Sequence, residues 1–166
     1  AVSHALESTW NRNATPVTLG LATKSLQLSI PALPRLKQAP EDIQARRAMM
    51  EASLLAGLAI SQTRTALAHS ISYPLTARFN LAHGLPCSFT LARALGFAGL
   101  EVFAAQLQML LRELGVAESL RACVPDAADA MALVGEMLTP GRADNNLRAA
   151  GLEDVGRVLE MALDEL

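Results

Sequence analysis

Apolar residues recur along most of this chain at alternating steps of three and four positions, which is the period of an α-helix. The clearest stripes lie over 103–114 and 152–166. Gly115 closes the first stripe as a helix C′ residue would, and Glu153 and Asp154 put acidic groups in the first turn of the second. No segment alternates apolar and polar residues as a half-buried strand does. The pattern predicts an all-α fold of roughly eight to ten short helices.

Prolines and capping residues define the expected ends of an early helix. Thr15 and Pro16 are the residue types of an N-cap and a first helical position, and the helix that they begin is predicted to run to about Ile30. Pro31 and Pro34 then predict an irregular connection, because proline lacks the N–H that a helix interior uses.

The next predicted helix is unusually apolar. Ile43, Met50, Leu54 and Leu58 mark one face of it, and residues 52–60 are apolar almost all round. A helix without a polar face is normally surrounded by other elements. We therefore predict that its second half is the most buried helix of the domain.

Three further segments complete the predicted helices. Residues 85–97 carry helical spacing, and Pro125 is predicted to begin a helix through Leu138, followed by a turn at 139–141. Residues 1–10 also have a helical pattern, but no residue precedes them that could cap the first turn. We therefore expect the chain to be a piece of a longer protein.

The composition suits one helical domain, 1–166, because 51% of the 166 residues are hydrophobic but only 4% are aromatic. The net charge is −2 and no basic block is longer than Arg46–Arg47, which argues against binding to nucleic acid or to an anionic membrane surface. The apolar runs are too short to span a bilayer, and the first residues lack the features of a signal peptide. Cys87 and Cys123 are predicted to be reduced, buried thiols of a cytoplasmic protein.

The chain has three histidines, and two of them, His69 and His83, lie in the segment 64–84. Pro74 stands between them and is predicted to break the helical pattern, so that the segment can fold back and bring both imidazoles to one point. His4 is the third. Three converging neutral imidazoles would form a metal site with room for one more ligand. Spacing alone leaves open whether they meet, and the alternative is three structural histidines.

Two stretches of the sequence carry a family resemblance. HSISYPLTARFNLAHG, residues 69–84, resembles the signature of the iron-containing (group III) alcohol dehydrogenases, and AVSHALES, residues 1–8, resembles an earlier motif of the same family. The resemblance covers essentially the whole chain as the C-terminal helical domain of the dehydroquinate synthase-like fold. It implies that the α/β nucleotide-binding domain of the family is absent from this chain.

The resemblance also implies a set of ligands and a reaction. The metal ligands of the family fall on His4, His69 and His83, and a fourth, an aspartate, stands in the family just before the position of Ala1. A bound Fe²⁺ or Zn²⁺ would act as a Lewis acid while hydride moves between NAD or NADP, held mainly by the missing domain, and an alcohol or aldehyde. We expect a small alcohol or aldehyde as substrate, a homodimer as the assembly, and an inactive isolated chain.

Two residues depart from the common pattern of the family. Tyr73 stands where many members carry a second histidine, and its phenol could be catalytic, by hydrogen bonding to a substrate oxygen or relaying a proton, or could simply pack. Arg64 could bind an anionic phosphonate or carboxylate substrate, or it could form a structural ion pair. The sequence around Arg64 resembles that of the phosphonoacetaldehyde reductase branch of the family, which implies the first role. Cys87 is not expected to bind metal, because the family site uses no thiol.

Two other functions remain open at this level. A glycerol dehydrogenase or a dehydroquinate synthase shares the two-domain plan with different ligands, and the residue before Ala1 would distinguish them. A non-catalytic helical interaction module with incidental histidines is the third hypothesis, and it predicts no dependence of metal content on His69 or His83.

Overall fold

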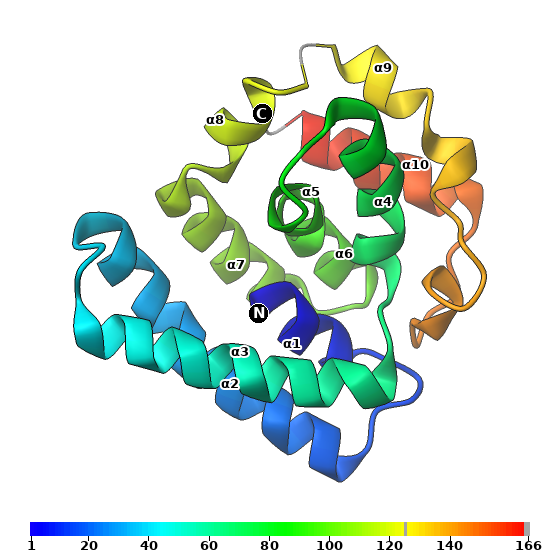
Figure 1. Cartoon of the computed structure of the whole chain (residues 1–166). Coiled ribbons are helices and arrows are strands. Elements are labelled where there is room, and N and C mark those ends of the chain that lie inside the picture. Colours follow the sequence, from blue (N-terminus) through cyan, green and yellow to red (C-terminus); the bar gives the residue numbers. More distant parts are fainter. Residues whose placement is uncertain (125, 165–166) are drawn as a thin grey trace. The chain divides into compact units, whose positions relative to one another are not determined.

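The computed structural model describes residues 1–124 and 126–164. It consists of two compact units, Ala1–Thr65 and Ala66–Leu166. The positions of the units relative to one another are not determined, and each is described by itself (Figure 1). All regular elements of the described residues are helices, which confirms the predicted all-α class. No helix in this part of the chain is both long enough and apolar enough to cross a membrane.

The first unit contains α1 (Val2–Thr9), α2 (Pro16–Gln38) and α3 (Ile43–Thr63). α2 and α3 pack along each other, and α1 packs on both (Figure 1). The core between them is made of fully buried alanines, namely Ala5, Ala22, Ala56 and Ala59. Side chains this small let helix backbones approach closely, and Ser25 Oγ in α2 donates a hydrogen bond of 2.8 Å to the carbonyl of Ala52 in α3.

The prediction that α2 ends near Ile30 is wrong. Pro31 and Pro34 lie inside the helix, which continues for two more turns. Each proline removes one backbone hydrogen bond, but the packing against α3 maintains the helical path. Arg35, in the last turns, also pairs with Asp42, the N-cap residue of α3, at 2.6 Å. Contacts distant in sequence therefore offset the local cost of the prolines.

The prediction that the second half of α3 is the most buried helix of the domain is also wrong. Ile43, Met50 and Leu54 are 63–75% exposed in the structure, and Leu58 is 46% exposed. The buried face carries Ala45, Ala52, Ala56, Ala59 and Thr63 instead. Close packing against α1 and α2 selects the small side chains, because larger ones would hold the helices apart. The apolar stripe of α3 consequently faces outward.

The second unit is built from shorter helices. They are α4 (Leu67–Phe79), α5 (Gly84–Phe89), α6 (Leu91–Phe97), α7 (Glu101–Leu114), α8 (Val116–Arg121), α9 (Ala127–Met131) and α10 (Leu152–Leu163), with 3-10 turns η1 (Val134–Glu136) and η2 (Ala143–Asn145). Its core is aliphatic, and its fully buried members include Leu67, Ile71, Leu75, Leu91, Leu95, Met137 and Leu159. Packing of bulky side chains therefore supports α4, the helix that carries His69.

Several sequence predictions for this unit are confirmed. Gly115 ends α7 in the left-handed conformation with φ 78°. In α10, Val155, Leu159 and Ala162 of the predicted stripe are buried, whereas Leu152 is 50% exposed and Leu166 lies outside the described residues. The helix predicted from Pro125 through Leu138 is wrong in its extent, since α9 ends at Met131 and η1 follows. Pro125 itself lies outside the described residues. Of the two free thiols, Cys87 is buried as predicted, whereas Cys123 is exposed.

Candidate functional site

α4 carries His69 in its first turns and remains helical through Pro74. The predicted break at Pro74 is therefore wrong. Proline removes only the bond to the carbonyl four residues earlier, and the buried side chains of Ile71 and Leu75 hold the helix against the core. The chain reverses later, at Asn80, which adopts the left-handed conformation with φ 51°. This reversal returns the chain toward α4.

The reversal brings His83, directly before α5, next to His69. The two ring centres lie 5.4 Å apart. Ligand atoms of His69, His83 and Cys87 all lie within 4.8 Å of one another. Small side-chain rotations would bring the two imidazoles to the separation of two ligands on one ion, whose bonds are about 2.0–2.1 Å long. The predicted convergence of these imidazoles is confirmed, and their binding of a metal stays a prediction.

Cys87, which was not expected to be a ligand, is the third member of this cluster. Its Sγ lies 3.6 Å from Nε2 of His83 and donates to Ser72 Oγ at 3.1 Å. Ser72 Oγ in turn donates to the carbonyl of His69 at 2.8 Å. The thiol hydrogen is thus used in a chain of bonds between α5 and α4. This role explains the burial of the thiol without metal binding.

Tyr73 lies one helical turn after His69, so that both side chains share a face of α4. Its ring centre is 6.4 Å from that of His69 and 5.7 Å from that of His83. The Tyr73 and His83 rings are stacked, with 24° between their planes. Tyr73 therefore belongs to the same cluster, and its catalytic role stays a prediction.

Arg142 also reaches this cluster, and sequence reasoning missed it. Its guanidinium carbon lies 4.0 Å from the centre of the Tyr73 ring. Arg142 directly precedes η2, far along the chain from Tyr73, and no motif near it indicates a site. The only local signal is the turn predicted at 139–141, where Gly141 has φ 79°.

Hydrogen bonds tie the segment before Arg142 to α4. Ser70 Oγ donates to the carbonyl of Met137 and accepts the backbone N–H of Thr139 at 3.2 Å. The side-chain amide of Asn145 donates to the carbonyl of Gly141 at 2.8 Å. Ser70 and Met137 are fully buried. The path of the chain toward Arg142 is therefore determined by the helix that carries His69 and Tyr73.

The two other predicted site residues belong to the first unit. His4 is half-buried on α1, and its carbonyl accepts Ser8 Oγ at 2.8 Å. Arg64 is the exposed C-cap residue of α3, with φ 68°, and its carbonyl accepts the Asn11 side-chain amide at 3.0 Å. Because the units are described separately, the metal role of His4 and the substrate role of Arg64 stay predictions.

The pKa of His83 lies below its ordinary value of 6.5, mainly because partial burial disfavours the charged ring and secondly because of the charge of His69. A neutral imidazole is the form that binds a metal. In an NMR titration of the metal-free protein, the pKa of His83 is expected to lie below that ordinary value. The variant His69→Gln should raise that pKa, since the Coulomb repulsion is lost. An unchanged or lower pKa in the variant would contradict this account.

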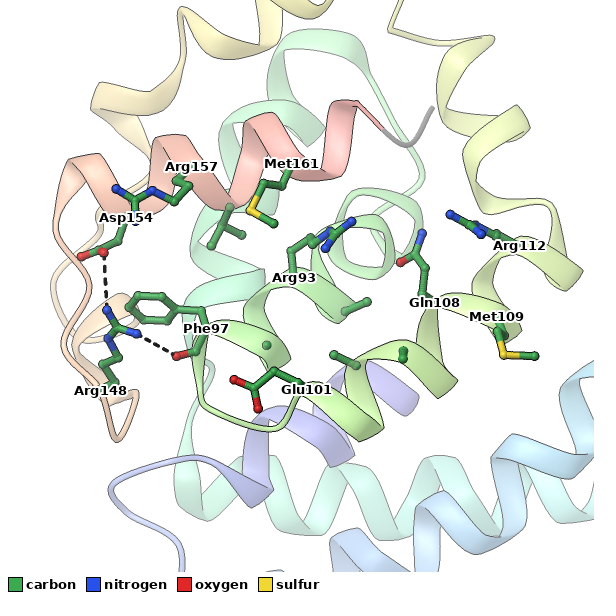
Figure 2. Close-up of a pocket in the computed structure, with 15 residues that line it drawn as sticks. Arg93, Phe97, Glu101, Gln108, Met109, Arg112, Arg148, Asp154, Arg157 and Met161 are labelled. Atoms are coloured by element: carbon green, nitrogen blue, oxygen red, sulfur yellow. Dashed lines mark hydrogen bonds and ion pairs between the residues drawn. The ribbon is translucent and has the colours of Figure 1, made fainter.

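The second unit also contains a hollow of about 650 Å³ between α6, α7 and α10 (Figure 2). No histidine is among its lining residues. Arg148, on its rim, donates to the carbonyl of Phe97 at 3.4 Å and lies 4.0 Å from Asp154. Arg157 pairs with Glu153 at 3.4 Å. Arg148 and Arg157 therefore already interact with other groups of this chain. None of the residues that line the hollow belongs to the histidine cluster.

Comparison with known proteins agrees with this arrangement. Residues 1–165 match the family model described as "Fe-containing alcohol dehydrogenase family, C-terminal". The phosphonoacetaldehyde reductase of Streptomyces viridochromogenes is 36% identical over 97 residues, which cover 58% of this chain and 25% of that protein. The NAD-dependent methanol dehydrogenase of Bacillus methanolicus is also 36% identical over 97 residues, 58% of this chain and 26% of that protein.

A solved structure shows the same fold. The alcohol dehydrogenase from Oenococcus oeni superposes with a TM-score of 0.89 at 19% identity, over 97% of this chain and 49% of that one. The chain thus spans about half the length of this solved relative. The segments that match the two curated relatives span about a quarter of each of them.

Proposed function

Since the chain belongs to the iron-containing alcohol dehydrogenase family, of which it is the C-terminal part, we propose that it forms the metal-binding part of an NAD(P)-dependent alcohol dehydrogenase or aldehyde reductase. The observation that carries the proposal is the pair of imidazoles 5.4 Å apart on α4 and before α5. The nucleotide would be held mainly by a second domain of the same enzyme, which the family resemblance implies.

His69 and His83 would hold the metal, Fe²⁺ or Zn²⁺, together with His4 and an acidic residue from outside this chain. When bound, the ion would supply Lewis acidity that polarises a carbonyl or lowers the pKa of an alcohol. His69 is 2% exposed, so the protein fixes its ring, whereas His83 is exposed and can face a substrate. The stacking of Tyr73 on His83 orients that second ring.

Tyr73 would act on the oxygen of the substrate. Its phenol is both a donor and an acceptor of hydrogen bonds. The centre of its ring lies 5.7 Å from the ring centre of His83 and 6.4 Å from that of His69. A hydroxyl in this neighbourhood can bind the oxygen of an alcohol or aldehyde and pass on its proton.

The charge of the substrate is a separate question from the reaction. The two relatives of equal identity are named for phosphonoacetaldehyde, which is anionic, and for methanol, which is neutral. Overall similarity therefore does not discriminate between them, and residues near the histidines must. We propose a short anionic aldehyde as substrate, and the physical basis is a cation beside Tyr73.

Turnover by the full-length protein that carries this chain tests the proposal. We expect oxidation of NADH or NADPH with an added short aldehyde, loss of at least nine-tenths of the rate after chelation, and recovery when Fe²⁺ or Zn²⁺ is returned. Heat-treated protein with the same metal is the control. A rate that does not change on chelation would contradict the metal dependence of the reaction. No turnover with any aldehyde would favour the non-catalytic module.

A further inference from the structure

We propose that Arg142 is the residue that binds the anionic group of the substrate and so selects anionic over neutral aldehydes. The inference rests on the proposed function and deepens it. The role predicted for Arg64 stays untested, whereas Arg142 lies on the cluster of His69, His83 and Tyr73 within the second unit. Nothing in the local sequence of Arg142 pointed to such a role.

The charge of Arg142 is available to a ligand. Among the residues that the structure describes, no carboxylate lies within ion-pair distance of its guanidinium, whose contact is with the Tyr73 ring at 4.0 Å. Other arginines of the second unit, such as Arg148 and Arg157, already pair with acids. A half-buried guanidinium without an acid gains most from an anion that arrives with a ligand.

The contact of Arg142 with Tyr73 is a cation–π contact, 4.0 Å from the guanidinium carbon to the ring centre. Such a contact does not use up the N–H groups of a guanidinium, which can bind two oxygens of one anion. Phosphonate, sulfonate and carboxylate groups all present such a pair of oxygens. The aromatic contact holds the cation in place and leaves its donors for the ligand.

Arg142 is also close to His83. The guanidinium carbon lies 4.0 Å from the Tyr73 ring centre, which lies 5.7 Å from the His83 ring centre. The guanidinium carbon is therefore less than about 10 Å from the centre of the histidine ring that would bind the metal. This separation suits a short substrate, in which only one or two carbon atoms stand between the anionic group and the carbonyl.

Hydrogen bonds fix the backbone near Arg142. The bonds of Ser70 to Met137 and Thr139 tie the preceding segment to α4, and Asn145 closes the turn at Gly141. A binding group on a fixed backbone loses less conformational freedom when the ligand arrives. Arg142 is thus placed for recognition by the same helix that places His69.

The test compares two aldehydes with the same CH2–CHO end on the full-length enzyme, phosphonoacetaldehyde and uncharged propanal, which has a methyl group in place of the phosphonate. In Arg142→Met, kcat/KM for phosphonoacetaldehyde is expected to fall about 10- to 100-fold, mainly through KM, and kcat/KM for propanal to stay within about threefold. Arg142→Lys should fall between, because lysine keeps the charge but loses the paired donors. Arg121, the exposed last residue of α8, provides the control for loss of one positive charge. Arg121→Met should leave kcat/KM for both aldehydes unchanged.

A second readout needs no turnover. Methylphosphonate binding to the metal-loaded enzyme, measured by calorimetry, is expected to weaken about 10- to 100-fold in Arg142→Met and to persist in Arg121→Met. Equal losses for the two aldehydes, or unchanged methylphosphonate binding, would overturn the assignment of Arg142. Absence of turnover in the unmodified enzyme would instead count against the proposed function, while the calorimetric comparison would still decide the anion site.

Discussion

Replacement of His69 or His83 by alanine is expected to reduce bound metal from about one ion per chain to less than a tenth, and to lower kcat/KM by about 1,000-fold or more. Each substitution removes one of two imidazoles whose ring centres lie 5.4 Å apart, and the proposed ligands that remain bind the ion much more weakly. Metal analysis of the purified full-length variants, paired with steady-state rates, measures both effects.

Cys87→Ser is the matched control for this experiment. Cys87 belongs to the same cluster, but its thiol already donates to Ser72 at 3.1 Å, and serine can donate in the same way. The variant should therefore keep its metal and most of its rate. Metal loss in Cys87→Ser equal to that in His69→Ala would make the thiol a ligand and would contradict the ligand set implied by the family. Unchanged metal in both histidine variants would favour a structural role for the rings.

Leu75→Ala is expected to lower the free energy of unfolding of the second unit by about 2–5 kcal/mol. Leu75 is 1% exposed on α4, two residues after Tyr73, and its removal leaves a cavity under the helix that carries the cluster. Urea unfolding followed by circular dichroism gives the free energy, and a two-state transition for this unit must be verified first.

The control for Leu75 is Leu147→Ala, which removes the same atoms from a side chain that is 71% exposed. Its expected effect is within about 0.5 kcal/mol, as for most surface substitutions. Similar losses of unfolding free energy in both variants would show that burial of the Leu75 side chain does not determine the stability of this unit. A loss confined to Leu75→Ala would confirm that the aliphatic core supports the site.

Helices that carry their own amphipathic pattern were predictable, and helices stabilised by close neighbours were not. α7 and α10 each repeat a stripe of large apolar residues, so their extent followed from the period alone. α3 has two apolar faces, one of bulky side chains and one of alanines, and the pattern does not say which is buried. Close packing with α1 and α2 buries the alanine face, because small side chains let the helices approach.

In the candidate site, too, the contacts between residues close in sequence were predictable and the contacts between distant residues were not. His69 and His83 are close in sequence, and a single reversal at Asn80 is enough to bring them together. Arg142 reaches Tyr73 only because buried Ser70 binds the segment that precedes it. Such a contact joins residues far apart in the chain, and no periodicity records it.

The sequence by itself thus determined the helical class, the amphipathic helices and the two histidine motifs, because each depends on residues within a few turns of one another. Only the tertiary structure decided that prolines at 31, 34 and 74 lie inside helices, which face of α3 is buried, and which cation stands over Tyr73. Those outcomes are set by close packing and hydrogen bonds between distant segments, whose free energies outweigh local preference.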